Sequence, residues 1–177
     1  MRALYTAEAL ATGEGRDGHG RTSDGKVDVD LATPTEMGGS GNGTNPEQLF
    51  AVGYAACYHS ALRLVAGQAK ANVDDSTVGS RVSIGKDNEG GFQLAVELEV
   101  TLPHLDKAEA QALADKAHKV CPYSNATRGN IDVTITVTDD RAATRPPVSV
   151  GSPPTADRHR RAGAGHDLRP QQQLRGG

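Results

Sequence analysis

The sequence predicts an α+β fold with a mostly antiparallel sheet, and two observations carry this prediction. Stretches in which apolar and polar residues alternate, the pattern of a strand with one buried face, occur in groups. The expected order is three strands, a long helix, two strands, a second helix and a last strand. Because strands and helices do not alternate one for one, a parallel α/β sheet is not expected.

The long helix, expected over residues 44–69, is the element around which the fold is organised. Asn45 or Thr44 can cap it, and Pro46 suits its first turn. Apolar residues cover nearly its whole circumference, which indicates a helix buried inside the fold. Small and polar residues interrupt it, so a membrane span is not expected. Cys57 lies near its middle.

The remaining elements follow from periodicity and turn signals. A second helix is expected over residues 106–120, and strands over residues 3–11, 21–23, 27–32, 78–86, 92–102 and 131–138. Pro122 is expected to end the second helix, because the residue before a proline is pushed out of the helical region. The glycine pattern G-x-G-x-x-G at residues 13–18 is rejected as a dinucleotide site, since no helix is expected after it.

Composition indicates one domain at residues 1–140 and a tail at residues 141–177. The chain of 177 residues has a net charge of −3, and the tail holds seven arginines against two aspartates, which leaves −8 on the first 140 residues. An acidic body argues against nucleic acid as the main partner. The tail is rich in Pro, Gly and Arg, so it is expected to be disordered and dispensable for activity. Without a signal segment or membrane span, a cytoplasmic protein is expected.

Two motifs are more specific. GYAAC at residues 53–57, after TNPEQLF, and VCPYSNATRGNIDV at residues 120–133 resemble the organic hydroperoxide resistance (Ohr) family of the OsmC superfamily, as does GRDG at residues 15–18. The resemblance covers about residues 1–140. It implies a sheet wrapped around long central helices, in an intertwined homodimer. It also implies a thiol peroxidase that reduces organic hydroperoxides, with dihydrolipoamide or a lipoylated protein as electron donor.

The resemblance also implies roles for individual residues. Carried over by position, Cys57 would be the peroxidatic cysteine and Cys121 the resolving cysteine. Arg16 and Glu47 would be the polar pair that activates Cys57, and Arg21 is a second arginine close enough in the sequence to serve. The resemblance implies no bound cofactor and no metal, because sulfur performs the redox step.

The chemistry of peroxide reduction is consistent with these roles. Attack on a peroxide needs a thiolate and a cation near the developing negative charge. Burial would raise the pKa of Cys57, so an arginine is needed to oppose it and a carboxylate is needed to hold that arginine. Cys121 is expected at the end of a helix, where the dipole disfavours a thiolate, which suits a thiol that waits for a sulfenic acid.

Alternatives exist for the two cysteines. Inert buried cysteines are common in protein cores, and only the surrounding motifs argue against them here. A zinc site built from Cys57, His59, His118 and Cys121 is disfavoured, because the first two project about 200° apart on one helix. A Cys–His hydrolase would lack a third member. A non-catalytic dithiol sensor or binding protein of the same fold, in which the cysteines only report oxidation, remains the main competitor.

A length argument predicts a shared site. Glu47 and Cys57 are ten residues apart, which corresponds to about 15 Å along a single helix. A glutamate cannot span that distance, even through an arginine. We therefore expect a two-fold homodimer in which Glu47 of each chain lies near Cys57 of the other.

Overall fold

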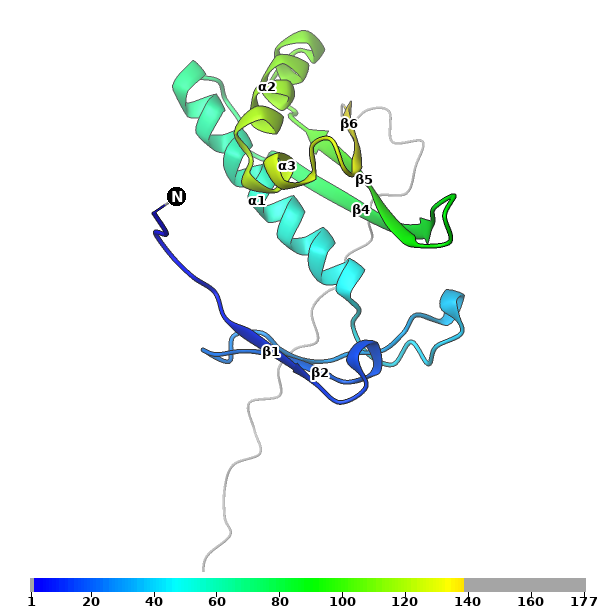
Figure 1. Cartoon of the computed structure of the whole chain (residues 1–177). Coiled ribbons are helices and arrows are strands. Elements are labelled where there is room, and N and C mark those ends of the chain that lie inside the picture. Colours follow the sequence, from blue (N-terminus) through cyan, green and yellow to red (C-terminus); the bar gives the residue numbers. More distant parts are fainter. Residues whose placement is uncertain (1, 139–177) are drawn as a thin grey trace, which may run out of the picture. The chain divides into compact units, whose positions relative to one another are not determined.

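The computed structural model describes residues 2–138, so the predicted boundary near residue 140 and the tail at residues 141–177 lie outside it. The elements are β1 (Ala9–Thr12), η1 (Gly15–Asp17), β2 (His19–Thr22), β3 (Asp28–Asp30), η2 (Thr35–Met37), α1 (Pro46–Ala69), β4 (Thr77–Lys86), β5 (Phe92–Thr101), α2 (Lys107–Val120), α3 (Pro122–Thr127) and β6 (Asp132–Thr138) (Figure 1). The α+β class and the order of the long elements are as predicted, with α3 added.

The strands form two three-stranded sheets. In the first, β1 pairs with β2 and β2 with β3, both antiparallel. In the second, β4 and β5 pair antiparallel over their whole length, whereas β5 and β6 are parallel. Parallel neighbours need a long crossover connection, and α2 with α3 supplies it. Three of the four strand pairs are therefore antiparallel, which confirms the predicted sheet type.

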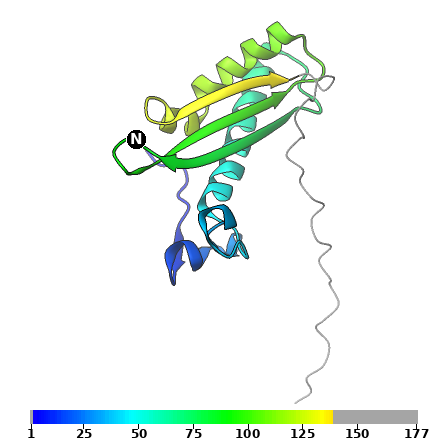
Figure 2. The ribbon, with the colours of Figure 1, turned by 90° about the vertical axis from the view of Figure 1, so that its right-hand side faces the viewer.

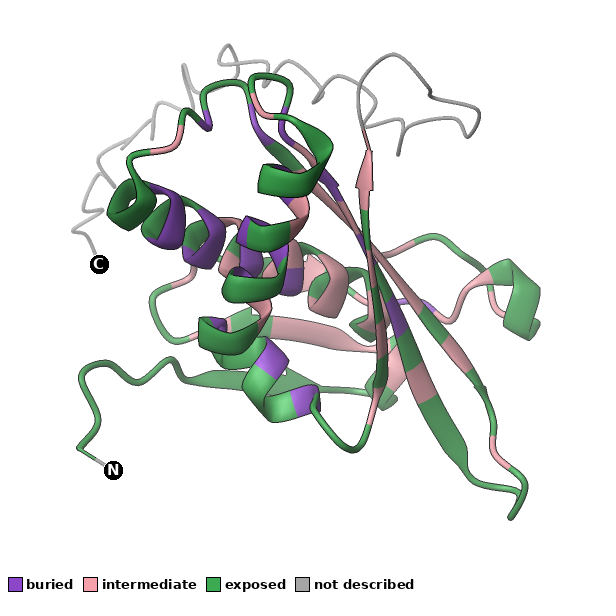
Figure 3. Ribbon diagram, turned by 90° about the horizontal axis from the view of Figure 1, so that it is seen from above, coloured by how far each residue is buried: buried purple, intermediate pink, exposed green. Residues whose placement is uncertain are grey.

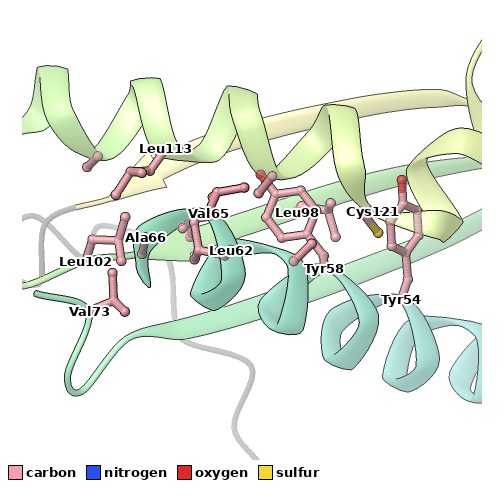
Figure 4. Close-up of a cluster of buried hydrophobic side chains, with 14 of the residues drawn as sticks. Tyr54, Tyr58, Leu62, Val65, Ala66, Val73, Leu98, Leu102, Leu113 and Cys121 are labelled. Carbon is pink, nitrogen blue, oxygen red and sulfur yellow. The ribbon is translucent and has the colours of Figure 1, made fainter. Parts of the chain in front are cut away.

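Helices α1 and α2 lie on the same face of the second sheet (Figure 2). Buried residues gather where the two helices and this sheet meet (Figure 3). On β5, Val96, Leu98 and Val100 are buried and alternate with more exposed residues, as their spacing predicts. From α1, Leu62 and Val65 pack into the same core (Figure 4).

The start of α1 is fixed by a capping box. The Asn45 side chain accepts a hydrogen bond from the Gln48 backbone N–H at 2.9 Å, and the Gln48 side chain accepts one from the Asn45 backbone N–H at 3.2 Å. Pro46 occupies the first helical position. Of the two predicted caps, Asn45 is therefore the one used.

The prediction that α1 is buried nearly all round is wrong for a single chain. Tyr54 and Leu62 are fully buried, but Leu49, Val52 and Leu64 are 41%, 71% and 59% exposed. The reason is geometric, because the second sheet and α2 cover only one side of the helix. By length and composition alone α1 could also cross a membrane, a test that the core helix of a soluble protein passes as well.

Three local predictions need correction or confirmation. The first strand covers residues 9–12 and not 3–11, because its ladder with β2 has only four residue pairs. The segment after Cys121, for which no helix was predicted, is the short helix α3, because Pro122 both ends α2 and opens α3 at its first position. The glycine-rich segment leads through η1 into β2, so no α-helix follows it, as predicted.

Candidate active site

The structure brings the two cysteines together. Cys57 lies in the middle of α1 and Cys121 at the junction of α2 and α3, and their Sγ atoms are 3.7 Å apart. Both are free thiols; Cys121 is fully buried and Cys57 is half-buried (Figure 4 shows the Cys121 sulfur beside Tyr54). Two thiols at this distance can form a disulfide after a small approach.

Backbone geometry explains the position of Cys121. Its N–H donates to the Ala117 carbonyl and its own carbonyl accepts from the Asn125 N–H, both at 2.9 Å. Its backbone is extended, with φ −64° and ψ 124°, so α2 ends here and α3 begins. The predicted helix C-terminus is confirmed. The dipole argument for a resolving role loses force, because the same residue also precedes a helix N-terminus.

Three effects act on the Cys57 thiol. Burial raises its pKa above the ordinary value of 9.0, and the neighbouring Cys121 raises it further. A backbone hydrogen bond from Tyr123, in the first turn of α3, lowers it. None of the groups in residues 2–138 that shift this pKa is a cation. These described residues of one chain thus favour the protonated thiol at Cys57, and a thiolate there would need a positive charge from elsewhere.

Arg16 and Glu47 form a second pair. The Arg16 guanidinium in η1 donates two hydrogen bonds, of 2.9 and 2.6 Å, to the two carboxylate oxygens of Glu47 in the first turn of α1. The arginine lowers the pKa of the Glu47 carboxyl, and the carboxylate in turn raises the pKa of Arg16. Arg21 instead lies 3.3 Å from an Asp28 oxygen. Of the two candidate arginines, Arg16 is the one held by Glu47.

The two pairs remain separate within one chain. Glu47 is the second residue of α1 and Cys57 lies ten residues later, so a rise of about 15 Å separates their backbones. The structure therefore joins Cys57 to Cys121 and Arg16 to Glu47, but it does not join the first pair to the second.

An aromatic cluster beside Cys57 went unassigned in the sequence analysis. The Tyr123 ring stacks on Phe50 with centroids 5.8 Å apart, and its centroid lies 5.6 Å from that of Tyr54. A Cβ at Gly53, one turn before Cys57, would lie 3.1 Å from the Tyr123 hydroxyl, so glycine lets this ring approach α1. The glycine in GYAAC was the available signal. The cluster gives the half-buried thiol an apolar neighbourhood.

The two histidines of the zinc alternative have hydroxyl partners. His59 Nε2 lies 2.9 Å from Ser76 Oγ, and His118 Nδ1 lies 3.0 Å from Ser124 Oγ. Within residues 2–138, no three His, Cys, Asp or Glu side chains are grouped so that they could hold a metal ion.

Comparisons with known proteins show the family of this chain. Residues 39–136 match the family model of OsmC-like proteins. The chain is 56% identical over 138 residues to the organic hydroperoxide resistance protein of Xanthomonas axonopodis pv. citri. The aligned region covers 77% of this chain and 96% of that protein. It is 48% identical over 132 residues to the organic hydroperoxide resistance protein OhrB of Bacillus subtilis, and this alignment covers 74% of this chain and 96% of that protein.

A solved structure shows the same fold. The crystal structure of an organic hydroperoxide resistance protein from Legionella pneumophila superposes with a TM-score of 0.74 at 52% identity, over 77% of this chain and 99% of that one. Fold, motifs and sequence identity lead to one conclusion. This chain belongs to the organic hydroperoxide resistance family of OsmC-like proteins.

Proposed function

We propose that the chain is a thiol peroxidase that reduces organic hydroperoxides to alcohols through Cys57. The observation that carries the proposal is the 3.7 Å separation of two free thiols, one half-buried and one buried. The Cys57 thiolate attacks one peroxide oxygen and the O–O bond breaks. The alkoxide takes up a proton and leaves as the alcohol, so Cys57 becomes a sulfenic acid.

Cys121 then resolves the oxidised Cys57. Its sulfur attacks the sulfenic sulfur, water leaves, and a Cys57–Cys121 disulfide forms. A dihydrolipoyl group, free or on a lipoylated protein, attacks this disulfide and gives it two electrons and two protons, so both cysteines return to thiols and the lipoyl group is oxidised to its own cyclic disulfide. Because Cys121 is fully buried, the half-buried Cys57 sulfur is the accessible point of attack.

A second copy of the chain supplies the missing charge. Within residues 2–138 of one chain, no cation shifts the pKa of Cys57, while Arg16 is held by Glu47 at the N-terminal end of α1. In a two-fold homodimer with antiparallel α1 helices, the Arg16–Glu47 pair of each chain would lie beside Cys57 of the other. The exposed Leu49, Val52 and Leu64 would then be covered by the partner.

The surroundings of Cys57 favour an organic substrate. Phe50 and Tyr123 stack on each other, Phe50 and Cys57 pack against the same core, and the Tyr123 backbone lowers the pKa of the Cys57 thiol. These rings offer apolar surface to the carbon group of an alkyl or aryl hydroperoxide. Hydrogen peroxide has no such group and gains nothing from these rings.

Steady-state turnover tests the function. Purified protein is mixed with tert-butyl hydroperoxide and dihydrolipoamide, and alcohol is measured against protein. An enzyme produces many equivalents of alcohol per chain. One equivalent of alcohol per chain, followed by a stable disulfide that dihydrolipoamide leaves unreduced, would favour the hypothesis of a non-catalytic dithiol sensor instead. Glutathione in place of the dithiol is the control for unspecific reduction.

A further inference from the structure

A chain of buried hydrogen bonds joins the three helices beside the cysteines. The Tyr54 hydroxyl on α1 lies 3.0 Å from Ser124 Oγ and 3.1 Å from Thr127 Oγ1, both on α3. Ser124 Oγ also lies 3.0 Å from His118 Nδ1 on α2. Tyr54, Ser124 and Thr127 are all buried, so their hydroxyls depend on these hydrogen bonds in place of bonds to water.

The direction of this chain can be deduced by counting protons. Thr127 Oγ1 donates to the Tyr123 carbonyl at 3.0 Å, and a carbonyl can only accept. Thr127 Oγ1 also lies 3.3 Å from the Ser124 carbonyl, so we assign its single proton to these two carbonyls and treat Thr127 as the acceptor from Tyr54. With that assignment, Ser124 donates to Tyr54 and His118 donates to Ser124 through an Nδ1–H.

The surroundings of His118 make this requirement specific. Burial and the nearby Arg128 guanidinium lower the pKa of His118, against a smaller opposing effect of Asp115. A neutral imidazole carries one ring proton, and its place is set by hydrogen bonding. The chain requires that proton on Nδ1.

What the chain holds in place is α3, and α3 carries two parts of the candidate site. Cys121 immediately precedes its first residue, and the Tyr123 backbone in its first turn lowers the pKa of the Cys57 thiol. α3 has only six residues, too few to be stable by itself, so its position depends on such tertiary contacts.

We propose that the hydroxyls of Tyr54, Ser124 and Thr127, with the His118 Nδ1–H as their terminal donor, position α3 so that Cys121 can resolve oxidised Cys57. This inference rests on the proposed function and concerns its second step. In that step the Cys121 sulfur displaces hydroxide from the Cys57 sulfenic acid, the S–O bond breaks as the S–S bond forms, and the Cys121 proton leaves with hydroxide as water. The four residues act through the placement of Cys121 and contact no substrate.

The test measures how well the two thiols are placed, without using a peroxide. The reduced protein is equilibrated with mixtures of reduced and oxidised glutathione, and the Cys57–Cys121 disulfide is quantified after acid quenching and alkylation. The equilibrium constant is the effective concentration of one thiol at the other. Tyr54→Phe and Ser124→Ala are each expected to lower it about tenfold, the usual effect of one lost hydrogen bond.

Tyr58→Phe is the matched control. Tyr58 is also fully buried on α1 and its hydroxyl donates to the Ala114 carbonyl on α2 at 2.7 Å, whereas no hydrogen bond among the described residues joins it to α3. It should cost similar stability and leave the effective concentration unchanged. An equal fall in all three variants, or no fall in the first two, would overturn the proposal.

Substitutions at the half-buried His118 test the direction of the chain with little risk to folding. Asn places an N–H donor near the position of Nδ1, whereas Gln places one near Nε2. His118→Asn should therefore keep the effective concentration, and His118→Gln and His118→Ala should lower it. The ¹⁵N spectrum of His118 should show the Nδ1–H form, and an Nε2–H form would contradict the deduced direction.

A peroxide assay on the same variants separates this proposal from the proposed function. With tert-butyl hydroperoxide and no reductant, Tyr54→Phe and Ser124→Ala should accumulate more Cys57 sulfinic acid per alcohol formed than wild type or Tyr58→Phe. If wild type forms no alcohol, the peroxidase function fails, but the glutathione measurement still decides whether the chain positions Cys121.

Discussion

Arg16 and Glu47 lie 31 positions apart in the sequence and meet through two hydrogen bonds of 2.9 and 2.6 Å. The pair ties η1 to the first turn of α1, so the glycine-rich segment before β2 is anchored to the helix that carries Cys57. Because this pair lies far from Cys57 of its own chain, variants of Glu47 and Cys57 can be placed on different chains to test the proposed homodimer.

Mixed dimers should restore a site that each variant lacks. Glu47→Ala removes the group that holds Arg16, and Cys57→Ser removes the nucleophile, so each homodimer should be poor or inactive. A dimer with one chain of each kind keeps one site with all its groups intact, and should regain up to half of the wild-type rate per dimer. The measurement is hydroperoxide consumption after the two variants are unfolded and refolded together. Unrestored activity, or a fully active monomer, would refute the shared site.

Glu47→Gln should destabilise the protein at neutral pH but not at low pH. Arg16 lowers the folded-state pKa of Glu47 below its ordinary value of 4.5. The pair's stabilisation is thus fully present above pH 4.5 and is lost as the pH falls through the lowered folded pKa. Because the arginine side chain is 37% exposed, the loss at pH 7 should be only about 1 kcal/mol. Urea unfolding at both pH values measures it.

The same pair allows a double-variant control. Arg16→Gln should cost the same as Glu47→Gln at pH 7, and the double variant should cost no more than either alone. Additive losses would show that the two side chains do not interact.

The two cysteine variants should stop the reaction at different steps. Cys57→Ser should abolish hydroperoxide consumption, because the nucleophile is gone. Cys121→Ser should leave the first oxidation intact and stall turnover, because no thiol resolves the sulfenic acid. Mass spectrometry of peroxide-treated Cys121→Ser should find Cys57 as sulfenic or sulfinic acid. A free Cys57 thiol in that sample would reverse or void the assignment.

Gly53→Ala should slow the first oxidation while leaving stability nearly unchanged. The added methyl group would lie 3.1 Å from the Tyr123 hydroxyl and 3.3 Å from its Cε2, so the ring must give way by a few tenths of an ångström, and we expect the Tyr123 backbone near Cys57 to move with it. The gain in helix propensity, about 1 kcal/mol, offsets this strain. The expected fall in the rate of Cys57 oxidation is roughly three- to tenfold, measured by stopped flow.

Gly67→Ala is the control in the same helix. A Cβ there would meet nothing within 4 Å, so this variant should gain up to about 1 kcal/mol and keep the wild-type oxidation rate. If Gly53→Ala also kept that rate, the position of Tyr123 would not matter to Cys57.

Much of the fold could be predicted because its patterns are local. The alternation on β5 and the cap at Asn45 depend on neighbours a few residues apart, and both are confirmed. The parallel pairing of β5 with β6 was not foreseen, because register between distant strands is set by tertiary packing. The helix after Cys121 was missed because Pro122 signals the end of one helix and the start of the next with the same residue.

The candidate site divides in the same way. The two cysteines were identifiable from their motifs, and the structure places their sulfurs 3.7 Å apart. The hydroxyl chain through Tyr54 and Ser124 was not predictable, because these residues are 70 positions apart and each is unremarkable in its own segment. Contacts of this kind appear only once α1 and α3 are packed together.

The separation of the two sulfurs has a consequence for signalling. A disulfide bond is about 2.05 Å long, so the sulfurs need to approach by only about 1.7 Å from their 3.7 Å separation. α2 and α3 can stay folded during such a movement, so we expect the reduced and oxidised chains to present nearly the same outer surface. A partner protein that recognises the surface of the chain would therefore bind the reduced and the oxidised form almost equally well. Oxidation at these cysteines is therefore suited to passing electrons onward and poorly suited to sending a message.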